Sequence, residues 1–437
     1  MMSKVQKLTE LLMDGKNMQY LAIDLGSSSA RIMLADGNKN LALTELARFP
    51  HSASLDSNGH YRWDIDKLFA SIKEEICEAI KKYQISSIGI CSWGVDYGVI
   101  AEDGKLIDMP YCYRDSRGEL MFKELHKQIS QEELFALSGI YPNSINTIYQ
   151  LYADKMQDRY AGKIVKIAMI ADLLAFYLTG NIRIERSNAS TTGILNLQGT
   201  DWNYQLLNNL GLDSEILPKL IFDGEQYGEF CGVPVVAVGT HDTASAIYAL
   251  EGLDNKTAFL ASGSWLLFGK VLDSPVCEKI AFENRYTNER INGGKVSLLD
   301  NINGLFIIQR LVSENNLNYK QIDENIDGAK VLGELDVDKL MSQDDMTGDM
   351  KKQLGIADCN IYDLVKTAYY SLAKRVVLAV ERLEQVTGEK IEKIVMTGGA
   401  TKAKYFVEML KNLSKIDIIC TKSEGATFGN ALRQSRV

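Results

Sequence analysis

The chain has 437 residues, more than the roughly 250–300 at which a single hydrophobic core stops growing, so its length predicts two domains and excludes a small binding module. Hydrophobic residues make up 46% of the chain and charged residues 24%, which is typical of a globular protein and not of a disordered one. The 57 acidic residues outnumber the 48 basic ones, giving a net charge of −9. Because such a surface repels phosphate backbones, we expect no nucleic-acid partner.

Cysteine and histidine content argues against disulfides and soft metals. The seven cysteines include no CxxC pair, and the four histidines form no HxxxH motif. We therefore expect a protein of a reducing compartment, the cytoplasm, with neither a disulfide framework nor a zinc centre. No segment reaches about 18 uninterrupted apolar residues, so we also expect no membrane partner.

The first part of the chain alternates strands with helices. Residues 1–17 precede the patterned region and are treated as an N-terminal tail. The expected elements after it are strands at 20–26, 32–35 and 85–90, a helix at 65–80 capped by Asp64, and helices near 131–138, 144–158 and 171–178. This alternation predicts an α/β domain over residues 18–249.

The same pattern restarts in the second part. The expected elements are strands at 233–238, 394–396 and 416–420, a strand–turn–strand unit at 258–269, and helices at 244–250, 363–386, 403–413 and 425–433. The unit at 258–269 repeats the layout of 20–35, which predicts an internal duplication. We expect a second α/β domain over residues 250–437, with the polar, acidic region 311–360 as a surface excursion.

Both strand–turn–strand units place glycine and serine at their turns. Amides free of bulky side chains can face phosphate oxygens, although similar turns occur in hairpins that bind nothing. Asp24 favours a binding site at the first turn, because a carboxylate at the end of a buried strand is costly unless it holds a partner such as Mg²⁺. Arg31 either reaches a phosphate or points to solvent.

Aromatic and charged side chains gather in two short blocks, 93–97 and 113–115. Trp93, Asp96 and Arg114 offer an aromatic face, a carboxylate and a guanidinium at strand ends, which suits a polyhydroxylated ligand. A core tryptophan and a structural Arg–Asp pair explain the same residues equally well.

His241, Asp242 and Thr243 follow a strand and open a helix of small residues. In a cleft between domains, Asp242 could accept a proton from a sugar hydroxyl as the hydroxyl attacks a phosphoryl group, or it could simply cap the helix. Gly398 and Gly399 could lie against a base or ribose, or only form a turn. The chain has no GxxxxGK[ST] motif, which excludes a P-loop nucleotide site.

The order of these motifs resembles that of one enzyme family. It runs Asp-x-Gly, Trp-Gly-Val-Asp-Tyr, Tyr-Arg-Asp, His-Asp-Thr-Ala-Ser-Ala, Ser-Gly-Ser-Trp and strand-Gly-Gly-helix. From Met18 onward it is similar to the FGGY carbohydrate kinases, whose two-domain α/β fold is the duplicated actin/hexokinase/Hsp70-like (ribonuclease H-like) fold with an interdomain cleft. Within the family the chain is most similar to the rhamnulokinases, chiefly through residues 241–246 and 301–309.

The resemblance implies a kinase that uses ATP and Mg²⁺ to phosphorylate a ketose, with L-rhamnulose as the expected substrate and its 1-phosphate as the product. Asp242 would be the general base and Asp24 would lie in the Mg²⁺ shell. The other implied contacts are Gly94, His241, Thr243 and Asn301 for the sugar, Ser27, Ser28, Ser29, Ala30 and Arg31 for the ATP phosphates, Ser264 for the transferred phosphoryl group, and Gln309 and Gly399 for the nucleotide.

Several sequence features depart from the family pattern. Ala30 stands where glycine is usual, and Ser264 where threonine is commoner. Region 284–300 keeps only Thr287–Glu289 of its family stretch. Since these changes affect the sugar side more than the phosphate side, a kinase for L-fuculose, L-xylulose or a similar ketose remains open. A catalytically silent sugar or nucleotide sensor also remains open. The oligomeric state, monomer or homodimer, is open as well.

Overall fold

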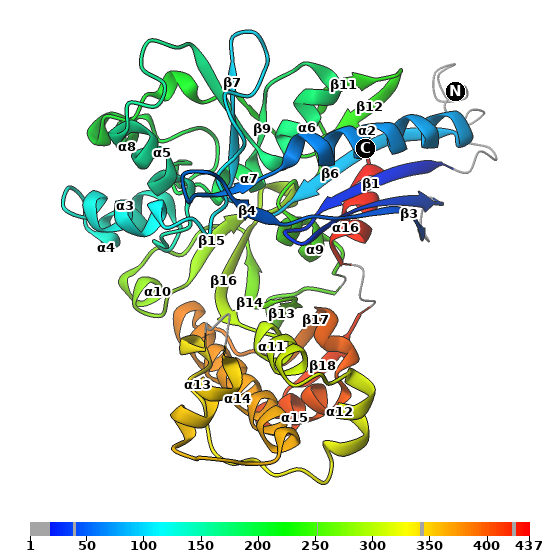
Figure 1. Cartoon of the computed structure of the whole chain (residues 1–437), viewed down its shortest axis with the longest axis vertical. Helices are drawn as coiled ribbons and strands as arrows, with labels where there is room; N and C mark the ends of the chain where they lie inside the picture. The colour runs from blue at the N-terminus through cyan, green and yellow to red at the C-terminus, as the bar shows by residue number, and fades with distance from the viewer. Residues whose placement is uncertain (1–17, 38–40, 251, 341–344, 422–424) are drawn as a thin grey trace, which may run out of the picture.

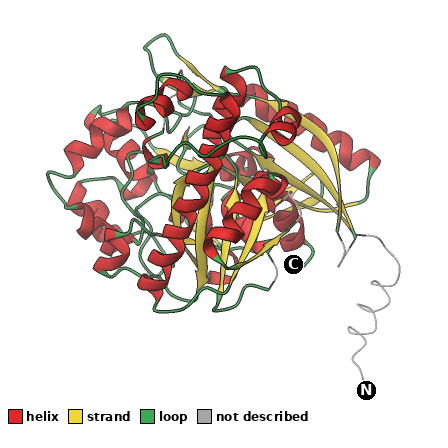
Figure 2. Ribbon diagram, turned by 90° about the horizontal axis from the view of Figure 1, so that it is seen from below, coloured by secondary structure: helices red, strands yellow, loops and turns green. Residues whose placement is uncertain are grey.

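The computed structural model describes residues 18–37, 41–250, 252–340, 345–421 and 425–437. Two six-stranded mixed sheets lie in the interior, with helices packed around them (Figures 1 and 2). The predicted tail at 1–17 lies outside the described residues. No helix within the described ranges is both long and apolar enough to cross a membrane.

The first sheet contains the N-terminal hairpin. In spatial order its strands are β11 (Gln226–Phe230), β12 (Val233–Val236), β6 (Ile85–Ser92), β1 (Gln19–Leu25), β2 (Ser29–Asp36) and β3 (Ala42–Pro50). β1 pairs antiparallel with β2 and parallel with β6. The hairpin predicted at 20–35 is confirmed.

The second sheet repeats this arrangement. Its order is β15 (Thr287–Arg290), β16 (Val296–Asn303), β14 (Trp265–Leu272), β13 (Thr257–Ser262), β17 (Lys393–Gly398) and β18 (Asp417–Cys420). β13 pairs antiparallel with β14 and parallel with β17, as β1 does with β2 and β6. This repetition confirms the predicted duplication; the two sheets differ in their extra edge strand, which lies beside β12 in the first and beside β16 in the second.

Three short two-stranded ladders complete the strands. They are β4 (Ala53–Leu55) with β5 (Tyr61–Trp63), β7 (Tyr97–Ala101) with β8 (Val165–Met169), and β9 (Ile184–Glu185) with β10 (Leu220–Ile221). The helices before β13 are α2 (Ile65–Lys82), α3 (Arg117–Leu125), α4 (Gln131–Ser138), α5 (Thr147–Met156), α6 (Ile170–Thr179), α7 (Arg186–Ser190), α8 (Tyr204–Leu210) and α9 (Asp242–Tyr248). The later ones are α10 (Lys279–Glu283), α11 (Phe306–Glu314), α12 (Tyr319–Asn325), α13 (Met346–Leu354), α14 (Ile361–Thr387), α15 (Lys404–Ser414) and α16 (Gly425–Gln434).

Two sequence expectations need correction. Asp64 occupies the N-cap position of α2, but its side chain makes no capping hydrogen bond. Region 311–360 is not a mere surface excursion, because Leu335, Met346 and Met350 are buried in the same core cluster as α14. Their apolar side chains are spaced too widely among polar residues for periodicity to reveal them.

We call the part of the chain before β13 the first half and the part from β13 onward the second half. Two helices join these halves, and each packs on the sheet of the other half. α9 follows the first sheet in the chain, yet Ala244 and Ile247 pack against Phe259 and Leu299 of the second sheet. α16 ends the chain, yet Gln434 Nε2 donates a hydrogen bond to the Leu21 carbonyl of β1 (3.0 Å). In Figure 1, α16 accordingly lies beside β1 and α9.

The contact between these helices is close enough to require glycine. An ideal Cβ at Gly429 of α16 would lie 1.7 Å from the Ser245 carbonyl oxygen of α9. No Cβ can occupy that space, so any larger residue must push the two helices apart.

We therefore expect Gly429→Ala to lower the free energy of unfolding by about 1–3 kcal/mol or more, because overpacking forces backbone shifts. Thermal melting would show a lower transition temperature. Gly328→Ala is the matched control, since its Cβ would meet only the Asn325 carbonyl oxygen, at 3.9 Å. Equal melting temperatures for the two variants would contradict the packing argument.

Candidate active site

The carboxyl ends of neighbouring strands bring the first group of predicted residues together. Asp24 of β1 lies in register with Cys91 of β6. The Ser92 amide donates to the Thr240 carbonyl (2.8 Å), so the loop after β12 continues alongside β6 up to His241. Asp24 and Asp242 are therefore carried to the same edge of the first sheet.

The charges of both carboxylates raise the pKa of one buried thiol. Burial, followed by the charges of Asp24 and Asp242, raises the pKa of Cys91 well above its usual value. Arg31 Nη2 donates to Asp24 Oδ2 at 2.6 Å and balances that charge. The site thus holds two neighbouring carboxylates, one of them already paired with a guanidinium.

Asp242 is the first residue of α9, and His241 occupies the N-cap position, so Asp242 does not cap the helix. Its side chain is 34% exposed. Burial of the group, helped by the charge of Asp24, raises the pKa of Asp242, while the charge of His241 and the Thr243 hydrogen bonds oppose the rise. A carboxylate with a raised pKa is a better proton acceptor than an ordinary aspartate.

The turn after β1 exposes part of its serine triplet. Ser28 is exposed, Ser27 and Ser29 are half-buried, and the Gly26 amide donates to the Ser29 carbonyl (3.1 Å). Ala30 is fully buried in the core, so only its backbone could face a ligand. His51 Nε2 lies 2.7 Å from the Gly26 carbonyl oxygen and ties this turn to the neighbouring aromatic block.

Trp93 and Asp96 point inward. Trp93 is 6% exposed and packs against His51 and Trp63. Asp96 is fully buried; its Oδ2 accepts hydrogen bonds from the indoles of Trp63 (2.7 Å) and Trp93 (3.0 Å), and burial raises the pKa of Asp96 to about 6. Gln150 donates to Oδ1. This geometry makes Asp96 a support for the tryptophans rather than an open ligand group.

Arg114 is exposed and lies over the ring of Tyr113, 4.7 Å from its centroid. Burial raises the pKa of Tyr113 to about 12, and a hydrogen bond with Ser27, in the turn predicted to hold phosphates, opposes the rise. Asp115 does not pair with Arg114; it accepts from the Tyr61 amide (2.9 Å) and faces His60. Arg114 therefore lies against Tyr113, the residue that interacts with Ser27 of that turn.

Gly94 is closely packed and Val95 has a strained backbone, and sequence patterns revealed neither property. An ideal Cβ at Gly94 would lie 2.9 Å from the Thr191 side chain. Val95 has φ 66°, which is strained for a β-branched residue, and its backbone is held by Thr191 Oγ1 (3.1 Å) and Thr147 Oγ1 (2.7 Å). Such strain persists only where neighbours enforce it, and it often marks functional sites.

The second half brings together the residues predicted for the nucleotide. Ser264 Oγ lies 3.5 Å from Gln309 Oε1. An ideal Cβ built at Gly399 would lie closest to the side chain of Leu305, the residue that precedes α11. Gly398 has φ 88°, and its ideal Cβ would lie 2.0 Å from the Ser262 carbonyl oxygen, so a side chain is excluded there.

Asn301 is exposed on β16. Because alternate residues of a strand share a face, it lies on the same side of the sheet as Leu299, which packs against α9. The sugar candidate from the second half therefore faces the side of the sheet on which the helix of Asp242 lies.

Two acidic residues that sequence reasoning did not assign lie around His241. Glu289 Oε2 is 3.2 Å from His241 Nδ1, and Glu185 accepts hydrogen bonds from the Thr240 amide and hydroxyl (both 3.1 Å). A signal existed for both, since a carboxylate within an otherwise buried strand needs a partner. Thr240 follows Glu185 by 55 residues and His241 precedes Glu289 by 48, so these contacts appear only in the fold.

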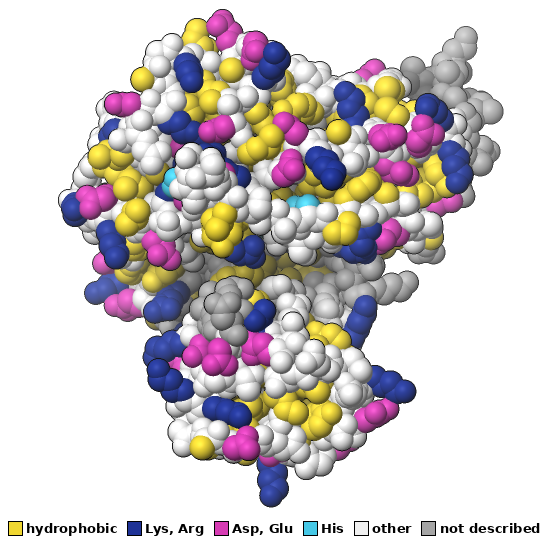
Figure 3. All heavy atoms as spheres, in the orientation of Figure 1, with side chains coloured by type: hydrophobic (Ala, Val, Ile, Leu, Met, Phe, Trp, Pro, Cys, Tyr) yellow, Lys and Arg dark blue, Asp and Glu magenta, His cyan; other side chains and the backbone are white. Residues whose placement is uncertain are grey.

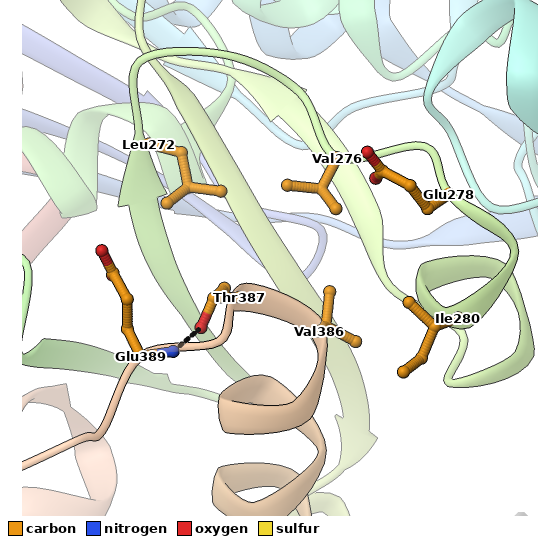
Figure 4. A pocket seen from close by; sticks show the side chains of 7 residues that line it. All are labelled: Leu272, Val276, Glu278, Ile280, Val386, Thr387 and Glu389. Atoms are coloured by element: carbon orange, nitrogen blue, oxygen red, sulfur yellow. Dashed lines mark hydrogen bonds between the residues drawn. The ribbon is translucent and has the colours of Figure 1, made fainter.

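The molecular surface is hollowed between the two halves (Figure 3). In the same orientation, α9 and β15, which carry Asp242 and Glu289, lie at the upper edge of this hollow (Figure 1). A separate pocket is lined by residues that include Leu272, Val386 and Glu389 (Figure 4). It lies at the opposite end of β14 from Ser264 and so is distinct from the candidate site.

Comparison with known proteins identifies the fold. Residues 19–251 match the N-terminal domain of the FGGY family of carbohydrate kinases, and residues 258–437 match its C-terminal domain. A xylulose kinase from Lactobacillus acidophilus superposes with a TM-score of 0.79 at 16% identity, covering 96% of this chain and 89% of that one. Plasmodium falciparum glycerol kinase with ADP gives the same TM-score and identity, covering 95% and 89%.

Curated relatives are similar along nearly the full length. A rhamnulokinase from Lactiplantibacillus plantarum is 30% identical, covering 95% of this chain and 89% of its own length, and one from Enterococcus faecalis is 28% identical, covering 95% and 88%. The family and fold predicted from the order of motifs are thus confirmed. The chain belongs to the FGGY family of carbohydrate kinases, ATP-dependent enzymes that transfer a phosphoryl group to a sugar hydroxyl.

Proposed function

We propose that this kinase converts L-rhamnulose and ATP into L-rhamnulose 1-phosphate and ADP, with Asp242 as the general base. The substrate is proposed from the similarity to the two rhamnulokinases. The role of Asp242 rests on one observation: its carboxylate, 34% exposed, opens α9 at the edge of the first sheet, 3.5 Å from the His241 ring and near Asp24. L-Fuculose, L-xylulose and related ketoses are the competing substrates.

In the proposed reaction, Asp242 accepts the proton of the sugar C1 hydroxyl as that oxygen forms a bond to the γ-phosphorus of ATP. The bond between this phosphorus and the β,γ-bridging oxygen breaks, and ADP leaves. His241, Thr243, Gly94 and Asn301 surround the sugar in this scheme. Trp93, supported by Asp96, forms the wall behind Gly94, and exposed Arg114 contributes a positive charge near the phosphates.

The phosphate and nucleotide contacts divide between the halves. Ser27, Ser28, Ser29, the Ala30 backbone and Arg31 are proposed for the ATP phosphates, and Ser264, Gln309, Gly398 and Gly399 for the transferred group and the nucleoside. Closure of the halves would exclude water that otherwise hydrolyses ATP.

Asp24 is proposed to hold Mg²⁺ through water or directly. Its carboxylate lies beside a second one, Asp242, an arrangement that favours a cation. Mg²⁺ is commonly bound by one or two carboxylates together with substrate phosphates, and among the described residues no three His, Cys, Asp or Glu side chains form a cage of their own. When bound, the ion neutralises charge on the phosphate oxygens.

Asp242→Asn should lower kcat for the ketose by about 10²–10⁴-fold, because positioned proton transfer typically contributes that much. An assay coupled to ADP release measures the change. Asp103→Asn, at an aspartate whose side chain is 60% exposed, is the matched control and should leave kcat unchanged. Turnover of Asp242→Asn within a few-fold of the unmodified protein would show that Asp242 is not the base.

A panel of L-rhamnulose, L-fuculose and L-xylulose should give the highest kcat/KM with L-rhamnulose. The same sugar should raise the melting temperature most, since a ligand that binds only the folded protein stabilises it. A higher kcat/KM for another ketose would overturn the substrate assignment but keep the kinase chemistry. Binding without any ADP release would instead indicate a sensor.

A further inference from the structure

One backbone amide at the end of β6 lacks a partner. Four of the five amides at 92–96 donate hydrogen bonds: to the Thr240 carbonyl (2.8 Å), the Leu25 carbonyl (3.2 Å), the Thr191 hydroxyl (3.1 Å) and the Gly94 carbonyl (2.8 Å). The exception is the amide of Gly94, which has no hydrogen-bond partner within the described part of the chain. Gly94 is buried, and an unpaired buried amide is costly, so this N–H indicates a partner from outside the chain.

The direction of that amide is set by a strained turn. The Asp96 amide donates to the Gly94 carbonyl, and Val95 between them has φ 66°, so the three residues form a γ-turn of positive φ. This kind of turn is rare, because a positive φ is costly for a β-branched residue. The turn therefore persists only where neighbouring groups hold it.

Two threonine hydroxyls hold the backbone of Val95. Thr191 Oγ1 accepts from the Val95 amide (3.1 Å), and Thr147 Oγ1 donates to the Val95 carbonyl (2.7 Å). The Thr191 hydroxyl itself donates to the Asn188 carbonyl (2.9 Å), which leaves its oxygen lone pairs for the Val95 amide. Both threonines are buried, so neither hydrogen bond competes with solvent.

The two threonines belong to one connected support. Asn146 Nδ2 donates to the Thr191 carbonyl (3.2 Å), so the N-cap of α5 is fastened to the residue that follows α7. Ser187 of α7 also accepts a hydrogen bond from the His241 amide (3.1 Å) through its Oγ. The turn at Gly94 and the start of α9 are thus held by the same group of elements.

We propose that Thr191 and Thr147 are positioning residues that hold the Val95 turn, and that this turn directs the Gly94 amide at a hydroxyl oxygen of the ketose. The inference rests on the proposed function, because it takes Gly94 to be a sugar contact. Neither threonine touches the reacting atoms. Both act on the affinity for the sugar, by keeping one hydrogen-bond donor in place before the sugar arrives.

The first test measures the dissociation constant of L-rhamnulose, or of the ketose that replaces it in the panel, without ATP. Thr191→Val keeps the shape of the side chain but removes the acceptor, so Val95 relaxes and the Gly94 amide turns away. The Kd for the ketose should rise about 10-fold or more, the size expected for one lost hydrogen bond to a ligand. The KM for ATP should stay unchanged.

Thr367→Val is the matched control. Thr367 is fully buried in α14, where its hydroxyl donates to the Asp363 carbonyl (2.6 Å) and accepts from the Leu332 amide (3.0 Å). Valine there removes the same two kinds of hydrogen bond, so it should lower the melting temperature and leave the Kd for the ketose unchanged. An equal rise in Kd would attribute the effect to lost stability and overturn the proposal. Thr191→Ser, which keeps the hydroxyl, should bind the ketose like the unmodified protein.

Val95→Gly tests whether the turn itself carries the effect. Glycine adopts a φ of 66° without strain, so the turn should persist with fewer contacts. Added to Thr191→Val, it should return the Kd toward that of the unmodified protein, although loss of the buried Val95 side chain lowers the melting temperature further. A merely structural role predicts that the two changes add. A double variant that binds the ketose no better than Thr191→Val overturns the proposal.

The outcomes separate this proposal from the proposed function. Because the Kd is measured without turnover, it does not depend on the role of Asp242. An unchanged Kd in Thr191→Val overturns the proposal alone, whereas a panel in which no ketose binds the unmodified protein overturns the substrate class and this proposal together. If Thr191→Val does not fold, Thr147→Val takes its place, since it leaves the Val95 carbonyl the longer hydrogen bond from Gln150 Nε2 (3.3 Å). An unchanged Kd in that variant likewise overturns the proposal.

Discussion

The contact between α9 and α16 determines where the candidate base lies. Gly429 allows α16 to approach the Ser245 carbonyl so closely that no side chain fits between the helices. α16 packs under β1, and α9 packs against Phe259 of the second sheet, so each helix belongs to both halves. The first residue of α9, Asp242, is therefore held at the boundary of the halves by packing rather than by a flexible loop.

Electrostatic balance is the second condition on the site. Asp24, Asp242, Glu289 and Glu185 bring several negative charges close together, which would be costly without compensation. Arg31 pairs with Asp24, and the His241 ring lies 3.2 Å from Glu289 and 3.5 Å from Asp242. Burial, helped by the charge of Asp24, raises the pKa of Asp242, which suits a proton acceptor.

Periodicity and motif order predicted the skeleton well. The helix expected at 131–138 is α4, and the one expected at 363–386, closed by Gly388, is α14, because regular apolar spacing and terminal glycine are local signals. The directions in which side chains point were harder to predict from the sequence. Trp93 and Asp96 stand in a motif that suggested an open sugar-binding face, yet they turn inward because Trp63, from another ladder, completes their hydrogen bonds. Glu289 was recognised only as part of a retained stretch, since its partner His241 is brought to it by sheet pairing that no local pattern encodes.

The buried aromatic residues also explain how the residues proposed for the sugar and those proposed for the phosphates keep fixed positions relative to one another. His51 packs on Trp93 and bonds to the Gly26 carbonyl of the turn proposed to hold phosphates, while Asp96 accepts a hydrogen bond from Trp93. Val95, strained at φ 66°, follows directly and is held by Thr191 and Thr147. Gly94 is therefore attached, through rigid neighbours, to the turn that carries Ser27 to Ser29. Under the proposed assignments, a ketose seated against Gly94 would therefore keep a constant distance from phosphates at that turn, whereas Asn301, the other proposed sugar contact, belongs to the second sheet.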